Sequence, residues 1–162
     1  MGILYLKEHA TCYNYMSCVR EGFLYHQFQP GELNEETNEA DCIFFILEGE
    51  LEIFCNGKVV GLTSGNMGCL SRGSVCRIHS LVRSSVVIAQ FDNMIQGCER
   101  ISFSQLHDLA SRVEDGMRPL EIRQSMKLFL ELLTGYLEDG AGCVHFHEIK
   151  LRELFWNTRF YY

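Results

Sequence analysis

The stretch of residues 42–78 constrains the fold of this sequence most, because short apolar runs alternate in it with turn signals. The apolar runs 42–47 and 51–55 precede the dipeptide Asn56-Gly57. This dipeptide favours a two-residue hairpin, since both turn positions need a positive φ. Residues 58–62 would form the returning strand. Short strands separated by turns in this way predict an antiparallel sandwich or barrel.

The segments on either side complete the predicted β-rich part. Residues 13–19 and 23–28, split by Arg20-Glu21-Gly22, predict a hairpin, and residues 32–41 form a polar, acidic stretch expected to be a loop. The sequence SSVVIAQF at residues 84–91 predicts the last strand of the barrel.

The composition changes near Cys98, and three helices are predicted after it. The first would start near residue 101 with Ser102 or Ser104 as N-cap, and the second near Pro119, which suits a first helical turn. The second helix carries one apolar stripe at helical spacing. The third, about residues 145–160, stops in mid-pattern, which indicates a fragment of a longer protein. We therefore expect a barrel over residues 1–98 and a helical segment over residues 99–162.

The bulk composition excludes several classes of protein. The chain has 162 residues and a formal charge of −7, with 21 acidic against 14 basic side chains. Nucleic-acid binding relies on Lys and Arg, so this balance argues against DNA contact by the chain itself. No apolar run approaches the roughly 20 residues of a membrane helix, and the N-terminus is too short for a signal sequence. The eight cysteines contain no C-x-x-C pair. We expect a cytoplasmic protein with reduced thiols and no membrane contact.

The stretch of residues 42–78 resembles the cupin family, because the glycines of the two cupin motifs are present in this region. Counting back from Gly49, the family's glutamate position is Cys42, and its two histidine positions fall on Glu36 and Asn38. The second motif has glycine, proline, glycine and histidine at fixed spacing, and these places are occupied here by Gly65, Ser71, Gly73 and Cys76. The resemblance implies a cupin-like antiparallel barrel, or jelly roll. It argues against a catalytic metal, because that needs three protein ligands and Cys42 and Cys76 are soft thiols of the wrong type.

A second resemblance, to cyclic-nucleotide-binding regulators, rests on residues 45–54 followed by Asn56-Gly57. The phosphate-binding run of that family is missing from residues 65–73, where Arg72 is weak evidence.

The order of a cupin-like barrel followed by amphipathic helices resembles the N-terminal regulatory domain of AraC-family bacterial transcription regulators. Residues 128–138 and 147–155 are similar to the linker helices of that group. The resemblance implies effector sensing and homodimerisation, with DNA bound only through a C-terminal helix-turn-helix domain absent from this chain. It implies no enzyme activity, no catalytic residue and no cofactor. The alternatives are a metal-dependent cupin enzyme, such as a sugar isomerase or dioxygenase, and a cyclic-nucleotide-binding domain.

A small-molecule effector would sit inside the barrel. The cupin facing pattern implies an inward lining of Cys42, Phe44 and Ile46 on one strand, with Cys76 and Ile78 on another. By alternation, His26 or Tyr25 and Gln90 or Ala89 compete for inward placement, and we favour His26 and Gln90. Such a lining suits a small amphipathic ligand, and it equally suits a barrel packed shut.

The second helix is the expected dimer helix, and either of two faces could form the contact. One face carries Phe129, Leu133 and Leu137, and the other carries Leu128 and Leu132. Tyr136 is also among the residues expected to take part in the dimer contact. The pattern His145-x-His147-Glu148 is not a predicted metal site, because residues two apart on a helix point in different directions. A solvated or interface face is the preferred interpretation there.

Overall fold

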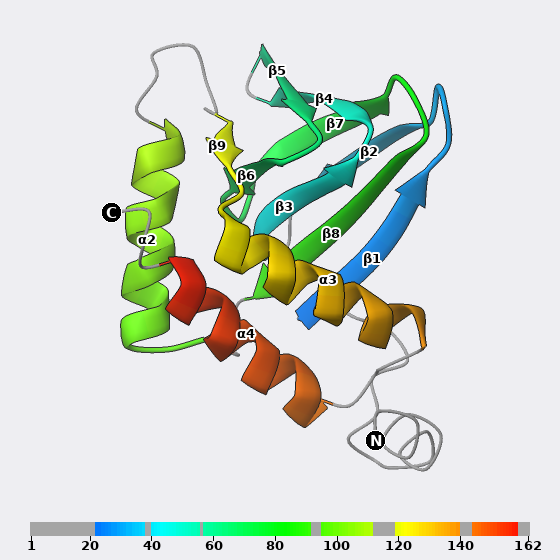
Figure 1. The fold of residues 1–162 in the computed structure, drawn as a ribbon. Coiled ribbons are helices and arrows are strands. Elements are labelled where there is room, and N and C mark those ends of the chain that lie inside the picture. Colours follow the sequence, from blue (N-terminus) through cyan, green and yellow to red (C-terminus); the bar gives the residue numbers. More distant parts are fainter. Residues whose placement is uncertain are drawn as a thin grey trace.

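A computed structural model of the chain describes residues 22–37, 40–55, 57–91, 95–111, 119–139 and 144–158. Two antiparallel sheets pack face to face, and three helices cover the outer side of one of them (Figure 1). The first sheet has the order β1 (Gly22–Phe28), β8 (Ser84–Phe91), β3 (Asp41–Glu48), β6 (Asn66–Leu70) and β9 (Leu120–Glu121). The second has the order β2 (Leu33–Thr37), β7 (Val75–Ser80), β4 (Glu50–Cys55) and β5 (Lys58–Thr63).

The first sheet is buried on both faces, which explains its nearly continuous apolar strands. On β3, Phe44 and Ile46 face the second sheet, while Ile43 and Phe45 face the helices. The same alternation holds on β8, where Val86 points inward to the second sheet. Successive side chains of a strand point to opposite faces, so one strand serves two cores.

The helices α2 (Cys98–Ser111), α3 (Gln124–Glu138) and α4 (Val144–Thr158) pack on the first sheet through a separate apolar cluster. Its centre is aromatic: the Phe91 ring meets those of Phe103 and Phe155 edge to face, with centroids 4.7 and 5.1 Å apart. Such pairs add to the free energy gained by burying the rings. The strands of the first sheet therefore contact the helices with one face and the second sheet with the other.

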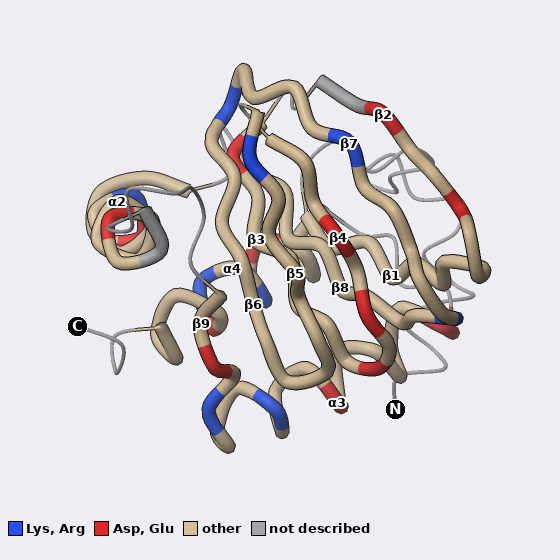
Figure 2. Tube along the Cα trace, turned by 90° about the horizontal axis from the view of Figure 1, so that it is seen from above, with Lys and Arg blue, Asp and Glu red and all other residues tan. Residues whose placement is uncertain are grey.

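The outer face of the second sheet is polar and lies toward solvent. Figure 2 shows acidic residues along β2 and β4. On this face Glu35 lies 3.8 Å from Arg77, and Glu52 lies 3.6 Å from His79 on the same central strand, β7. An antiparallel sheet with one face on a core and one in water shows this alternation.

Several sequence predictions are confirmed. The fold is mainly β with α, β8 covers residues 84–91, and β1 covers the predicted strand at 23–28. Cys55 pairs with Lys58 across a two-residue turn in which Gly57 has a φ of +75°. The predicted strand at 13–19 lies outside the described residues.

Other predictions are wrong. Residues 33–37 form β2 instead of a loop, because an edge strand facing solvent on one side tolerates polar side chains. α2 begins at Cys98, so Ser102 and Ser104 lie inside the helix and neither is its N-cap. α3 begins at Gln124 rather than near Pro119, since residues 120–121 first add β9 to the edge of β6.

No helix in the described part of the chain is both long and apolar enough to cross a membrane.

Candidate ligand-binding site

Five of the predicted lining residues lie together between the two sheets. Their side chains are at most 4% exposed and belong to one apolar cluster, the inner cluster; they are Cys42, Phe44, Ile46, Cys76 and Ile78. The facing pattern carried over from the cupin resemblance therefore puts each residue on the inward side. Their side chains form part of the core between the sheets, and a role in ligand contact stays a prediction.

His26 and Gln90 lie on the same inward side, His26 on the edge strand β1 and Gln90 near the end of β8. On β1, Phe28 belongs to the inner cluster, so His26 shares its face, whereas Tyr25 packs against the helical side. On β8, Ala89 is buried in the helical cluster, which leaves Gln90 on the inward face. Of the alternatives Tyr25 or His26 and Ala89 or Gln90, the inward-facing residues are therefore His26 and Gln90.

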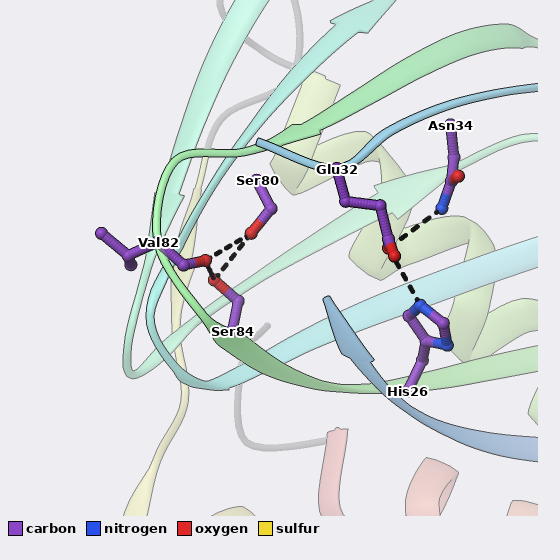
Figure 3. A network of polar contacts seen from close by, with 6 residues as sticks. All are labelled: His26, Glu32, Asn34, Ser80, Val82 and Ser84. Atoms are coloured by element: carbon purple, nitrogen blue, oxygen red, sulfur yellow. Dashed lines mark hydrogen bonds and ion pairs between the residues drawn. The ribbon is translucent and has the colours of Figure 1, made fainter. Parts of the chain in front are cut away.

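His26 takes part in a small polar cluster where β1 turns into β2 (Figure 3). Its Nε2 lies 3.2 Å from Glu32 Oε2, and the Asn34 amide donates to the same oxygen at 3.4 Å. The His26 ring rests edge-on against Phe28, with centroids 4.4 Å apart. The His26 side chain is 41% exposed. This cluster orients an imidazole at the rim of the sandwich.

A second polar network joins Ser80, Val82 and Ser84 in the turn between β7 and β8 (Figure 3), and Ser84 connects this turn to the start of β4. The Ser84 hydroxyl donates to the Val82 carbonyl at 2.9 Å and accepts from the Glu50 N–H at 3.0 Å. Ser80 Oγ lies 3.2 Å from Ser84 Oγ. Both serines are fully buried, so the network satisfies backbone groups where the two sheets meet.

The described residues also line an open groove of about 730 Å³ between α3 and one end of the first sheet. Its helical wall consists of Lys127, Leu130, Glu131, Thr134, Gly135 and Glu138. The opposite wall and floor consist of Tyr25, Gln27, Ile46, Leu47, Glu48, Ser64, Gly65, Ser85 and Ile122. This volume lies in the range of small-molecule sites, about 300–1,000 Å³.

The groove combines an apolar floor with a polar, acidic rim. Ile122 and Leu130 are buried beneath it, while Glu48, Glu131 and Glu138 are exposed at its sides. Lys127 is the single cationic side chain among the lining residues. Gln27 donates a hydrogen bond of 3.1 Å to the Tyr25 hydroxyl on the sheet wall. Such a rim favours an amphipathic ligand that carries a positive charge.

The groove was not predicted from the sequence. Ile46 is the only residue of the predicted ligand pocket that also lines the groove. A signal was present: Lys127, Glu131, Thr134 and Glu138 recur at helical spacing and form a polar stripe beside the apolar one. The stripe alone reads as a solvated helix face. Only the packing of α3 over the end of the first sheet turns it into one wall of a groove.

The predicted dimer helix, α3, divides its residues between core and surface. Phe129 and Leu133 are buried against the sheet, and Tyr136 and Leu137 pack partly against the same cluster. These four do not offer a free apolar face. Leu128 and Leu132 are 55% and 69% exposed. Of the two faces predicted for dimerisation, the structure leaves this one on the surface.

The two histidines of α4 have different surroundings. His145 is exposed, whereas His147 is fully buried and its Nδ1 accepts a 3.0 Å hydrogen bond from the Phe23 N–H. The prediction of a solvated or interface face is therefore wrong for His147, which ties α4 to β1. Across the described ranges, no group of three or more His, Cys, Asp or Glu side chains is placed to hold a metal ion.

Cys69 is a buried thiol with a large pKa shift. Complete burial in the cluster under the helices raises the pKa of its thiol from 9.0 to about 12, because a thiolate cannot be solvated there. Cys69 is therefore a neutral core residue at physiological pH.

No protein-family model matches this chain, and no curated protein matches its sequence. Several solved structures are similar over part of it. A putative ethanolamine utilization protein Q from Salmonella typhimurium is 19% identical, with 43% of this chain covering 55% of that protein at a TM-score of 0.41. A DUF861 family protein from Thermotoga maritima is 19% identical, with 45% of this chain covering 83% of it at a TM-score of 0.40. A cupin superfamily protein from Desulfitobacterium hafniense is 18% identical, with 48% of this chain covering 84% of it at a TM-score of 0.39.

Proposed function

We propose that this chain is a cupin-type sensor domain that binds a small amphipathic molecule and relays its presence through α3. The strand order supports the cupin-type, jelly-roll interpretation. Apart from the β4–β5 hairpin and the added β9, successive strands alternate between the sheets, which gives the orders β1-β8-β3-β6 and β2-β7-β4-β5. Eight strands in two such sheets are the arrangement of a double Greek key.

The position of α3 carries the functional proposal. One face of this helix supplies Lys127, Glu131 and Thr134 to the groove, and another face presents Leu128 and Leu132 to solvent. A ligand in the groove would contact the helix directly. It can change the arrangement of the exposed face only if it binds one arrangement of α3 more tightly than another.

The regulatory role extends this proposal to a second copy of the chain. In the AraC-family resemblance, the helices after the barrel dimerise, and Leu128 and Leu132 are the exposed apolar residues of the corresponding helix. DNA contact is assigned to a separate domain, because a chain of net charge −7 repels phosphates.

A thermal-shift screen of the chain tests the proposal. The probes are aliphatic primary amines, small carboxylic acids, sugars and cyclic nucleotides. A ligand at a hundred times its dissociation constant adds about 2.7 kcal/mol to the free energy of unfolding, which raises Tm by several degrees. We expect the amines to give the selective shift, because the groove carries three carboxylates against one ammonium group.

Matched variants show whether the shift comes from the groove. Glu131→Lys reverses the charge on its helical wall and should abolish the shift, whereas Glu121→Lys, an exposed position on β9 that does not line the groove, should retain it. An equal shift in both variants would place the ligand elsewhere. The proposal would be contradicted if cyclic nucleotides gave the selective shift in Tm, or if none of the four classes shifted it.

A further inference from the structure

Two cysteines lie directly opposite each other on neighbouring strands of the second sheet. Cys55 ends β4, and its Cα partner on β7 is Cys76. Residues that are directly opposite in an antiparallel pair point to the same face of the sheet. Here that face is the inward one, because Cys76 is a member of the inner cluster and Cys55 packs against it while remaining partly exposed.

Backbone hydrogen bonds identify the type of this pair. The Leu81 N–H donates to the Glu50 carbonyl at 3.2 Å, so the position Glu50–Leu81 is hydrogen-bonded. Bonded and non-bonded pairs alternate along an antiparallel ladder, which makes Cys55–Cys76, five positions along the same register, a non-hydrogen-bonded pair. The bond from the Ser64 N–H to the Gly49 carbonyl on the β5 side gives the same parity, because it directs the backbone of odd-numbered β4 residues toward β5.

A non-hydrogen-bonded pair has the spacing that a disulfide requires. Its Cα atoms lie about 4.5 Å apart. Disulfides join Cα atoms that are roughly 4.4–6.8 Å apart, so this pair needs no movement of either strand. Cys42 also belongs to the inner cluster, but it lies on β3 of the facing sheet, and packed sheets are separated by about 10 Å. Cys69 faces the helices on the far side of the first sheet.

We propose that Cys55 and Cys76 form a reversible disulfide when the protein meets hydrogen peroxide. Cys55 is the more accessible of the two, so its thiolate attacks one peroxide oxygen and becomes a sulfenic acid. The O–O bond breaks, and the hydroxide that leaves takes up the proton lost by the thiol and becomes one water molecule. The Cys76 sulfur then attacks the Cys55 sulfur, the S–S bond forms and a second water molecule leaves. The two thiols together lose two electrons and two protons, and the peroxide is reduced. The bridge fastens β4 to β7 through Cys76, which is one of the predicted lining residues.

Peptide mapping of the oxidised chain tests this assignment. The full chain is treated with hydrogen peroxide, remaining thiols are alkylated, and a digest without reductant is read by mass spectrometry. We expect a linked pair of peptides that contain Cys55 and Cys76, lighter than their sum by two hydrogen atoms and separated by dithiothreitol. Cys55→Ser should remove this species. Cys98→Ser, which changes an exposed thiol on α2, should retain it.

The alternatives give distinct products. The assignment would be overturned if Cys76 were linked to Cys42, or if Cys55 or Cys76 were linked to any other cysteine. Over-oxidation of Cys55 while Cys76 is alkylated would also overturn it. Alkylation of both residues after peroxide treatment would do the same. If Cys55→Ser fails to fold by circular dichroism, Cys55→Ala repeats the comparison with a smaller apolar side chain.

Discussion

Gly49 joins β3 to β4 at a position that tolerates no side chain. Its φ is +92°, and a Cβ there would lie 2.7 Å from the Arg83 carbonyl oxygen and overlap Ser84 Oγ. Ser84 Oγ is the atom that accepts the Glu50 N–H, so a side chain at residue 49 would disturb the buried serine network as well. The close approach of two turns, rather than the turn conformation alone, requires glycine here.

Gly49→Ala should therefore cost more than an ordinary glycine substitution. We expect overlap to lower the free energy of unfolding by about 1–3 kcal/mol, in addition to about 1–2 kcal/mol of left-handed backbone strain. Gly57→Ala is the matched control, since its φ is +75° and nothing lies within 4 Å of a Cβ there. Urea denaturation measures both variants. Equal losses would show that the contact with the Arg83–Ser84 turn is not tight.

Cys69 gives the chain a specific alkaline sensitivity. In the unfolded chain this thiol ionises near its ordinary pKa of 9.0, while in the folded chain burial raises the pKa to about 12. Between these values the unfolded state has lost a proton that the folded state keeps, so stability falls as the pH rises, by up to about 1.4 kcal/mol per pH unit. Below pH 9 the contribution is constant.

Removal of the thiol should flatten this pH dependence. We expect Cys69→Ala to lose stability at neutral pH through its cavity, yet to show a shallower decline in the free energy of unfolding from pH 9 upward than the wild type. Cys98→Ala, at an exposed thiol, should retain the wild-type slope. Identical slopes for wild type and Cys69→Ala would mean that residue 69 ionises equally in both states.

At the scale of elements, α4 is fixed to β1 by one buried imidazole. His147 Nδ1 accepts the Phe23 N–H, and the two rings are stacked with centroids 6.4 Å apart. Gly22 permits this approach, because a Cβ there would lie 2.6 Å from Nδ1. The first residues of β1 are thus bonded to β8 on one side and to a helix on the other.

His147→Phe should keep the packing and lose the acceptor. We expect the free energy of unfolding to fall by about 1–3 kcal/mol, because the buried Phe23 N–H is left without its partner. Amide exchange at Phe23 should accelerate by more than the global loss of stability explains. His145→Ala, at an exposed position of the same helix, should leave both quantities near their wild-type values. Unchanged Phe23 exchange in His147→Phe would show that the bond contributes nothing to stability.

At the scale of the whole molecule, the helical layer presents apolar side chains on its outer surface. Leu128 and Leu132 of α3 are exposed, as are Ile149 and Trp156 of α4, each at 61%. Isolated exposed apolar residues are common, but several on one helical layer favour contact with another protein surface.

Self-association through α3 should respond to charge on this surface. We expect the chain to dimerise at micromolar concentration, and Leu128→Glu with Leu132→Glu to shift it to a monomer without loss of Tm, because both positions are more than half exposed. Val59→Glu is the matched control, since Val59 is a 54% exposed apolar residue on β5 of the second sheet. Light scattering reads the mass. A monomeric wild type would remove dimerisation from the proposed function.

Local sequence patterns predicted most of the strands and helices of this protein. Apolar runs and the Asn56-Gly57 turn located β3, β4, β5 and β8, because turn geometry and strand alternation depend on neighbouring residues only. The facing pattern implied by the cupin resemblance placed Cys42 and Phe44 on the inward side, where both lie. Helical periodicity located α4 to within two residues at each end, and it predicted α3 but started that helix near Pro119 instead of Gln124.

What those elements face depends on contacts between segments that are distant in the chain. β2 is polar and became a strand because β7 offered its edge, and β9 displaced the start of α3 because β6 did the same. His147 is buried, and the polar stripe of α3 lines a groove, because of which helix lies over which strand. These contacts join residues distant in the chain, and a periodic pattern carries no information about the partner it will meet.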